Sequence, residues 1–138
     1  MSLVVDASLT LSWYFADERS AEADAILDRI AETGAIVPVL WRLEVANGLQ
    51  VAIRRKRIDA DFRDRAIQQL AMLPIRVDAE TAAFAWTTTL QLADRFKLTV
   101  YDACYLELAQ RREVPLATLD KDMRDAGRAV GVRLQGRD

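Results

Sequence analysis

The sequence predicts an α/β fold in which a central, mainly parallel sheet is covered by helices on both faces. Short apolar runs alternate with helical segments along the chain, as in parallel sheets joined by crossover helices. The helical segments repeat apolar residues at i, i+3, i+4 and i+7, so each has one face to bury. With 138 residues and 51% hydrophobic content, one domain over residues 1–138 is expected.

In the first half of the chain, apolar runs and capping residues define the expected elements. The run from Leu3 to Val5 is a strand that ends at Asp6, and Ser8 is placed to cap a helix reaching about Phe15. The elements expected next are a helix from Ser20 to Gly34, a strand over residues 35–38, a helix with an inner stripe from Trp41 to Ala52, and a helix capped by Asp59 or Asp61 and stopped by Pro74.

The second half continues the same alternation. We expect a strand at residues 75–77 and then a long helix from Ala79 to about Phe96, with Asp78 as its cap. This helix contains Ala83, Trp86, Leu90 and Ala93. The elements expected after it are a helix from Thr99 to Arg112, a strand at residues 115–119, a helix from Lys121 to Val130 and a strand from Val132 to Leu134. Ligand sites of parallel sheets lie at the carboxyl ends of the strands. Asp6 and Asp120 both fall at or just beyond such ends.

Composition narrows the chemistry that the chain can perform. The 19 Lys and Arg against 21 Asp and Glu give a net charge of −2, so binding of nucleic acid would be local. The absence of histidine excludes the usual serine and cysteine triads and most catalytic zinc sites. Cys104 has no partner for a disulfide, and no apolar run approaches the roughly 20 residues of a membrane span. A cytoplasmic protein that does not enter the membrane is expected.

Carboxylates therefore remain as the candidate reactive groups. Asp6 ends the first strand, Glu44 flanks the apolar stripe of its helix, and Asp102 lies in an apolar stretch at the start of another helix. Asp120 follows the fourth strand, with Asp122 and Asp125 as nearby substitutes for it. Each residue taken alone is also compatible with a structural role: Asp6, Asp102 and Asp120 with a turn or helix-cap position, and Glu44 with a half-exposed helix position.

Carboxylates gathered at one end of a sheet repel each other unless cations neutralise them. Oxygen ligands without His or Cys favour Mg²⁺, with Mn²⁺ as a plausible substitute. One or two such ions could hold a phosphodiester in line with an activated water.

The stretches that carry these residues resemble the PIN-domain family, and within it the VapC-type toxins of toxin–antitoxin pairs. They occur in the family's order and span almost the whole chain, and they are Val4-Val5-Asp6-Ala7-Ser8, Leu43 to Leu49 (LEVANGL), Leu98 to Ala109 (LTVYDACYLELA) and Pro115 to Asp120 (PLATLD).

The resemblance implies a three-layer α/β/α fold, metal-dependent endoribonuclease activity, a homodimer and inhibition by a small cognate antitoxin. It also implies that the catalytic metal ligands are Asp6, Glu44, Asp102 and Asp120, with Thr118 and Asn47 as supporting polar groups. Attack by water on RNA would leave a 5′-phosphate and a 3′-hydroxyl.

Two surface features bear on partners. The basic run from Arg54 to Arg57 and the shorter Arg111-Arg112 are either solvated helix ends or contacts to RNA phosphates, with Arg54 and Arg55 as the candidates. The consecutive aromatics Trp13 to Phe15 cannot share one helix face, so at least one is expected to be exposed and available to a dimer or antitoxin groove.

Two other functions compete with a nuclease. A phosphatase of the haloacid-dehalogenase type also opens with an apolar strand and a nucleophilic aspartate, but it expects a second Asp where this chain has Ser8. A non-catalytic binding module would use the same acidic residues merely as helix caps.

Overall fold

The centre of the molecule is a parallel sheet with the strand order β3-β2-β1-β4-β5. The computed structural model describes residues 2–136, and within them β1 pairs with β4 and β4 with β5, while β2 pairs with β3. A single parallel bridge between Leu3 and Ala35 joins the two parts. The strands are β1 (Val4–Val5), β2 (Ala35–Val37), β3 (Ile75–Val77), β4 (Leu116–Ala117) and β5 (Leu134–Gln135).

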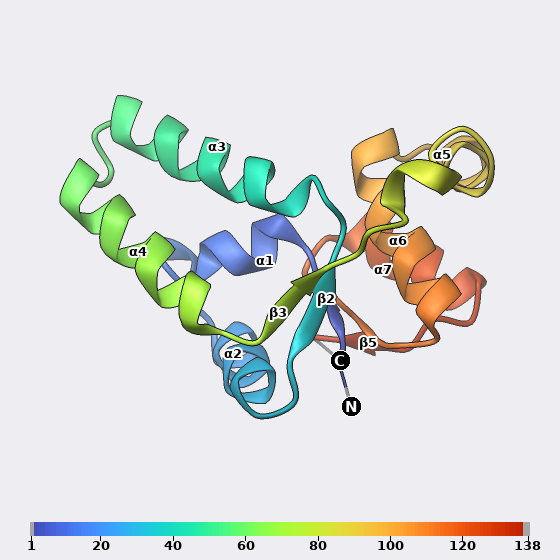
Figure 1. The fold of residues 1–138 in the computed structure, drawn as a ribbon, viewed down its shortest axis with the longest axis horizontal. Coiled ribbons are helices and arrows are strands. Elements are labelled where there is room, and N and C mark those ends of the chain that lie inside the picture. The colour runs from blue at the N-terminus through green and yellow to red at the C-terminus, as the bar shows by residue number, and fades with distance from the viewer. Residues whose placement is uncertain (1, 137–138) are drawn as a thin grey trace.

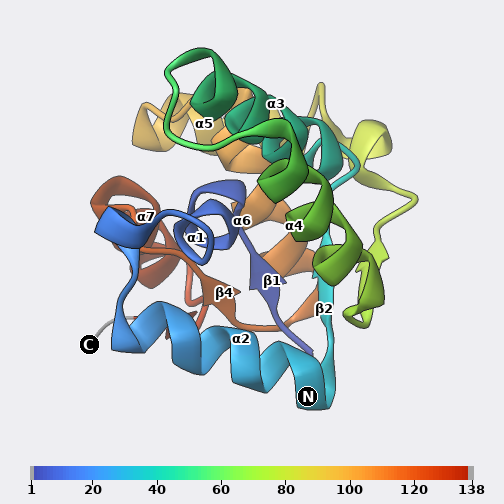
Figure 2. The same ribbon diagram turned by 90° about the vertical axis from the view of Figure 1, so that its left-hand side faces the viewer.

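Helices cover both faces of this sheet. They are α1 (Ala7–Ser12), α2 (Ala21–Thr33), α3 (Trp41–Arg54), α4 (Ala60–Met72), α5 (Thr88–Phe96), α6 (Val100–Arg112) and α7 (Lys121–Ala129), with short 3₁₀ helices η1 (Ala16–Glu18) and η2 (Thr81–Phe84). Figure 1 shows α1 to α4 on one side of the strands and α5 to α7 on the other. Figure 2 shows α2 running along one edge of that arrangement. The expectation of a three-layer α/β/α fold is confirmed.

The core is built around β1 and α6. Leu3, Val4 and Val5 are fully buried, as expected of a central parallel strand that is covered on both faces. On α6, Leu106 and Leu108 are buried as well. None of the helices within residues 2–136 has the length and apolar character required to cross a membrane. The expectation of one domain stays a prediction.

The first helix differs from the expectation in both of its ends. Asp6, not Ser8, is the cap, because Leu9 N donates to Asp6 Oδ1 at 2.8 Å while Ser8 is exposed. The helix ends at Ser12 and not near Phe15. Since the three aromatics therefore follow the helix, their side chains are not confined to one helical face. Trp13 and Phe15 are buried and Tyr14 is half-buried, so the expected exposed aromatic is not found.

The long helix expected over residues 79–96 is also wrong. The chain forms η2, a turn, and then α5, with Thr87 at φ −120° and ψ −100° between them. Three consecutive threonines, Thr87 to Thr89, lower helix propensity at this point because their branched side chains crowd the preceding turn. Trp86, which was expected along this helix, is 89% exposed instead of packing against the core.

Smaller differences concern element boundaries. Asp59, and not Asp61, caps α4, because Phe62 N donates to Asp59 Oδ1 at 2.8 Å. The last strand, β5, begins at Leu134, two residues later than the expected Val132. Differences of one or two residues are ordinary at element ends, where regular hydrogen bonding fades gradually.

Candidate active site

Asp6 lies at the point where β1 ends and α1 begins, and its side chain is buried. Oδ1 accepts the hydrogen bond from Leu9 N, and Oδ2 accepts one from the Thr118 hydroxyl at 2.5 Å. Thr118 follows β4, the strand next to β1, so the carboxyl ends of two neighbouring strands bring these side chains together. Hydrogen bonds to both carboxylate oxygens therefore fix the position of the Asp6 side chain.

Thr118 also connects Asp6 to Asp120. Its hydroxyl accepts a hydrogen bond from Asp120 N at 3.1 Å while donating to Asp6. Asp120 in turn caps α7, because Met123 N donates to Asp120 Oδ2 at 2.9 Å. Asp125 faces elsewhere and pairs with Lys121 and Arg128 on the surface of α7.

Glu44 and Asp102 approach the same edge of the sheet from opposite helical layers. Glu44 lies in the first turn of α3 and Asp102 in the first turn of α6, whose cap is Thr99. Both side chains are half-buried. The Tyr105 hydroxyl, also on α6, donates to Glu44 Oε1 at 2.5 Å.

The electrostatics show that these carboxylates lie within reach of one another. The pKa of Asp6 is raised to about 6: burial is the main cause and the Asp102 and Asp120 carboxylates add to it, while the hydrogen bonds from Thr118 and Leu9 N lower the pKa. The pKa of Asp102 is raised by burial and by Asp120. The pKa of Glu44 is raised by burial and, against the Tyr105 hydrogen bond, by Asp102.

This cluster is rich in negative charge and in oxygen ligands, which suits a hard divalent cation. Within residues 2–136, however, no three acidic or thiol side chains are close enough to hold an ion by themselves. That spacing agrees with Mg²⁺, which typically binds one or two carboxylates and fills its other positions with water and phosphate oxygens. The donor set and the mutual repulsion therefore fit such an ion without a closed protein cage.

Two other groups of expected site residues lie apart from the cluster. Asn47 is exposed one turn after Glu44, and among the hydrogen bonds of the described part of the chain none joins it to the four carboxylates. Arg54 and Arg55 are exposed at the far end of α3, ten residues and therefore about 15 Å beyond Glu44 along the helix.

A second buried charge cluster, which sequence patterns do not indicate, is centred on Arg111. Its guanidinium donates to both oxygens of Asp78 at 3.2 and 2.7 Å, to both oxygens of Glu107 at 2.7 and 3.1 Å, and to Glu80 at 3.1 Å. Asp78 and Glu107 are buried, and Arg111 also stacks over the Phe84 ring.

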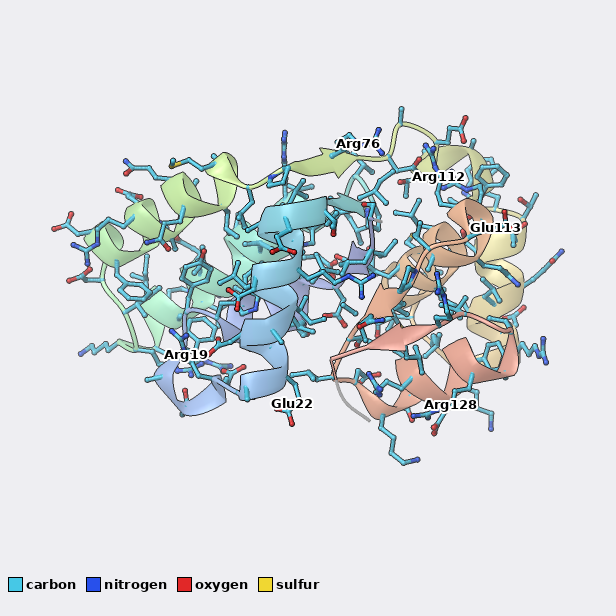
Figure 3. The ribbon with its side chains drawn as sticks, turned by 90° about the horizontal axis from the view of Figure 1, so that it is seen from below. Arg19, Glu22, Arg76, Arg112, Glu113 and Arg128 are labelled. Atoms are coloured by element: carbon cyan, nitrogen blue, oxygen red, sulfur yellow. The ribbon has the colours of Figure 1, made fainter. Side chains whose placement is uncertain are left out.

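Two expectations are corrected by this cluster. Asp78 does not cap a helix: it receives Arg111, Arg112 and the Thr81 hydroxyl, and these hydrogen bonds hold its pKa down at about 2 against its burial. Arg111 is fully engaged with carboxylates and not available to RNA phosphates. Arg112 lies at the edge of the cluster, beside the segment that follows β3 (Figure 3).

Comparison with known proteins agrees with the fold and assigns the family. The family model of the PIN domain matches residues 3–129, and the chain belongs to this family. Ribonuclease VapC3 of Pyrobaculum aerophilum is 31% identical over 123 residues, which cover 89% of this chain and 92% of the relative. Ribonuclease VapC9 of Mycobacterium tuberculosis is 30% identical over 127 residues, 92% of each chain.

A solved structure supports the same fold. A chain of VapBC2 from Rickettsia felis, bound to a DNA fragment from its promoter, matches with a TM-score of 0.68 and 12% identity, covering 100% of both chains. Membership of the PIN-domain family removes the haloacid-dehalogenase alternative, which Ser8 already disfavoured.

Proposed function

We propose that this protein is a metal-dependent endoribonuclease that hydrolyses RNA at the carboxylates Asp6, Glu44, Asp102 and Asp120. The observation that carries the proposal is the mutual repulsion of these side chains around a buried Asp6 whose pKa is raised to about 6. A fold maintains such repulsion when a cation and a phosphodiester relieve it in the working state. The names of the VapC relatives, which are ribonucleases, support the same chemistry.

The chain's own residues have separate roles in this proposal. Thr118 fixes Asp6 and the backbone of Asp120, so that both carboxylates face the edge of the sheet from neighbouring strands. Glu44 and Asp102 approach from α3 and α6. When bound, Mg²⁺, or Mn²⁺ in its place, supplies neutralisation of the phosphate charge and lowers the pKa of water. RNA cleavage also leads us to propose a cytoplasmic location.

Mapping the ends of the RNA products tests the proposed chemistry. Hydrolysis by water leaves a 5′-phosphate and a 3′-hydroxyl, so the downstream fragment should be ligated without prior phosphorylation. A 2′,3′-cyclic phosphate would mean that the ribose hydroxyl is the nucleophile and would contradict the proposed carboxylate mechanism.

We further propose that the protein is the toxin of a VapBC-type pair and that its cognate antitoxin occupies the groove between η1, the end of α3 and the start of α4. This groove has a volume of about 1000 Å³ and an apolar floor that includes Tyr14, Phe15 and Phe62. The charged lining residues are Asp17 and Arg57, which pair with each other, Asp59, which caps α4, and the basic Lys56 and Arg65. The last two suit an amphipathic segment with acidic residues. Tyr14→Ala with Phe62→Ala should weaken antitoxin binding, and Met72→Ala, at an exposed site outside the groove, should not.

A homodimer is the last part of the proposal. Large apolar side chains are exposed on α3 and around α5, namely Leu43 at 75%, Trp86 at 89% and Leu90 at 39%. The start of α3 and α5 lie at the same upper side of the molecule in Figure 1, so one partner surface could cover both. Light scattering should give a dimer mass for the unmodified protein and a monomer mass for Leu43→Asp with Trp86→Asp.

A further inference from the structure

Tyr105 is a buried residue of α6 whose hydroxyl reaches across the carboxyl edge of the sheet to the opposite helical layer. It lies three residues after Asp102, on the same side of the helix, and its side chain is fully buried. Its hydroxyl meets Glu44 Oε1 on α3 at 2.5 Å. Figure 1 shows α3 and α6 on opposite sides of the strands, so this bond joins the two layers at the site.

Glu44 needs such a contact to face the cluster. Its carboxylate ends a flexible, half-buried side chain and is repelled by Asp102; burial first, and then this repulsion, raise its pKa. Repulsion and solvation both favour rotamers that point outward. The Tyr105 hydroxyl opposes them, because a hydrogen bond to a charged acceptor is stronger than one between neutral groups.

We propose that Tyr105 is a positioning residue, whose hydroxyl holds the Glu44 carboxylate toward Asp102 and so completes the set of oxygen ligands. The inference rests on the proposed function. It assigns Tyr105 no proton transfer: burial and Glu44 raise the pKa of the phenol, so it remains a donor throughout the working pH range. Glu44 Oε2 has no hydrogen bond among the described residues and remains available to a ligand.

The ring and the hydroxyl of Tyr105 have separable roles. The ring fills the core beside Leu106 and Leu108, so its removal would damage the fold. Tyr105→Phe keeps the ring and deletes only the donor oxygen. Tyr101→Phe is the matched control, because Tyr101 lies on the same helix and is 64% exposed.

The test is a double-mutant cycle on Mn²⁺ affinity, measured by electron paramagnetic resonance of the free ion. Loss of groups that orient a metal ligand typically weakens metal binding about 10- to 100-fold. Tyr105→Phe should raise the Mn²⁺ dissociation constant about 10-fold, whereas Tyr101→Phe should leave it unchanged. In a Glu44→Gln background, Tyr105→Phe should change the constant less than about 2-fold, because the acceptor to be positioned no longer carries a charge.

The outcomes separate the inference from the function on which it rests. Equal Mn²⁺ affinity in Tyr105→Phe and the unmodified protein, with weakened binding in Glu44→Gln, would overturn the positioning role alone. An unmodified protein that binds no Mn²⁺ and cuts no RNA would overturn both.

Discussion

The Thr118 hydroxyl donates to Asp6 Oδ2 at 2.5 Å and accepts from the backbone N–H of Asp120. One side chain thereby links the carboxyl ends of β1 and β4 through two hydrogen bonds. Burial raises the pKa of Asp6, and the hydrogen bond from Thr118 lowers it. Thr118 therefore keeps Asp6 closer to its charged form. The threonine is thus an electrostatic component of the site as well as a structural one.

Thr118→Val should therefore shift the acid limb of the pH–rate profile. The substitution keeps the shape but removes the donor, so the pKa of Asp6 should rise above about 6 and activity should fall at higher pH than in the unmodified protein. Thr118→Ser retains the hydroxyl and should retain the profile. An unchanged acid limb in Thr118→Val would show that Asp6 does not control that limb.

Asp6→Asn should stabilise the metal-free protein at neutral and higher pH. The pKa of Asp6 is raised in the folded state from 3.8 to about 6, so folding favours the neutral form. This stability is present below the unfolded pKa and is lost as pH rises through the folded pKa. At pH 8 in EDTA, removing the buried charge should increase the free energy of unfolding by about 3 kcal/mol.

The gain from Asp6→Asn should vanish below pH 3.8, where Asp6 is protonated in both states. Urea unfolding at pH 8 and at pH 3.5 measures the difference. Addition of Mg²⁺ at pH 8 should stabilise the unmodified protein and not the variant, since ligands that bind the folded state stabilise it. A variant less stable than the unmodified protein at pH 8 in EDTA would contradict the burial of an ionised Asp6.

Arg111→Met should destabilise the fold strongly. The substitution leaves Asp78 and Glu107 buried without their cation, and removing one partner of a buried charge cluster costs about 3 kcal/mol or more. Arg112→Met is the matched control, because Arg112 contacts the same Asp78 but its side chain is 43% exposed. Its removal should cost less than about 1 kcal/mol. Similar losses of stability in both variants would show that the burial of Arg111 does not determine how much it stabilises the fold.

Arg54→Glu with Arg55→Glu should weaken RNA binding and flatten its dependence on salt. Removing one cation that binds a phosphate reduces the slope of log affinity against log salt by about 1. Arg95→Glu with Lys97→Glu, at the end of α5, makes the same change in charge and should retain the slope. Identical slopes for both double variants would identify Arg54 and Arg55 as solvated helix ends.

The positions of the carboxylates were predictable because strand exits and helix starts are readable from the sequence. Asp6 and Asp120 follow apolar runs, and parallel strands bring their carboxyl ends to one edge. The interpretation of such residues as caps was also correct for these two, since each caps a helix while facing the cluster. Capping a helix therefore does not exclude the site role that we propose for them.

The contacts that hold the cluster were not predictable in the same way. Tyr105 and Glu44 are 61 residues apart, and Arg111 and Asp78 are 33 apart, so no periodicity relates the members of either pair. Asp78 stands directly before the helical pattern of residues 79–96 and so has the local pattern of a helix cap, and only the packing of α6 shows that it pairs with Arg111. Long-range pairing of charges depends on the fold and leaves no local pattern.

The most direct test is RNA cleavage by purified protein, free of any partner, with Mg²⁺, with EDTA, and as the variants Asp6→Asn and Asp102→Asn, each verified as folded. We expect cleavage with Mg²⁺ that is abolished by EDTA and reduced at least about 100-fold in both variants. Cleavage that persists in EDTA or in both variants would contradict the metal-dependent carboxylate site. A folded protein that neither cuts RNA nor binds Mg²⁺ would instead be a binding module in which these acidic residues act only as caps.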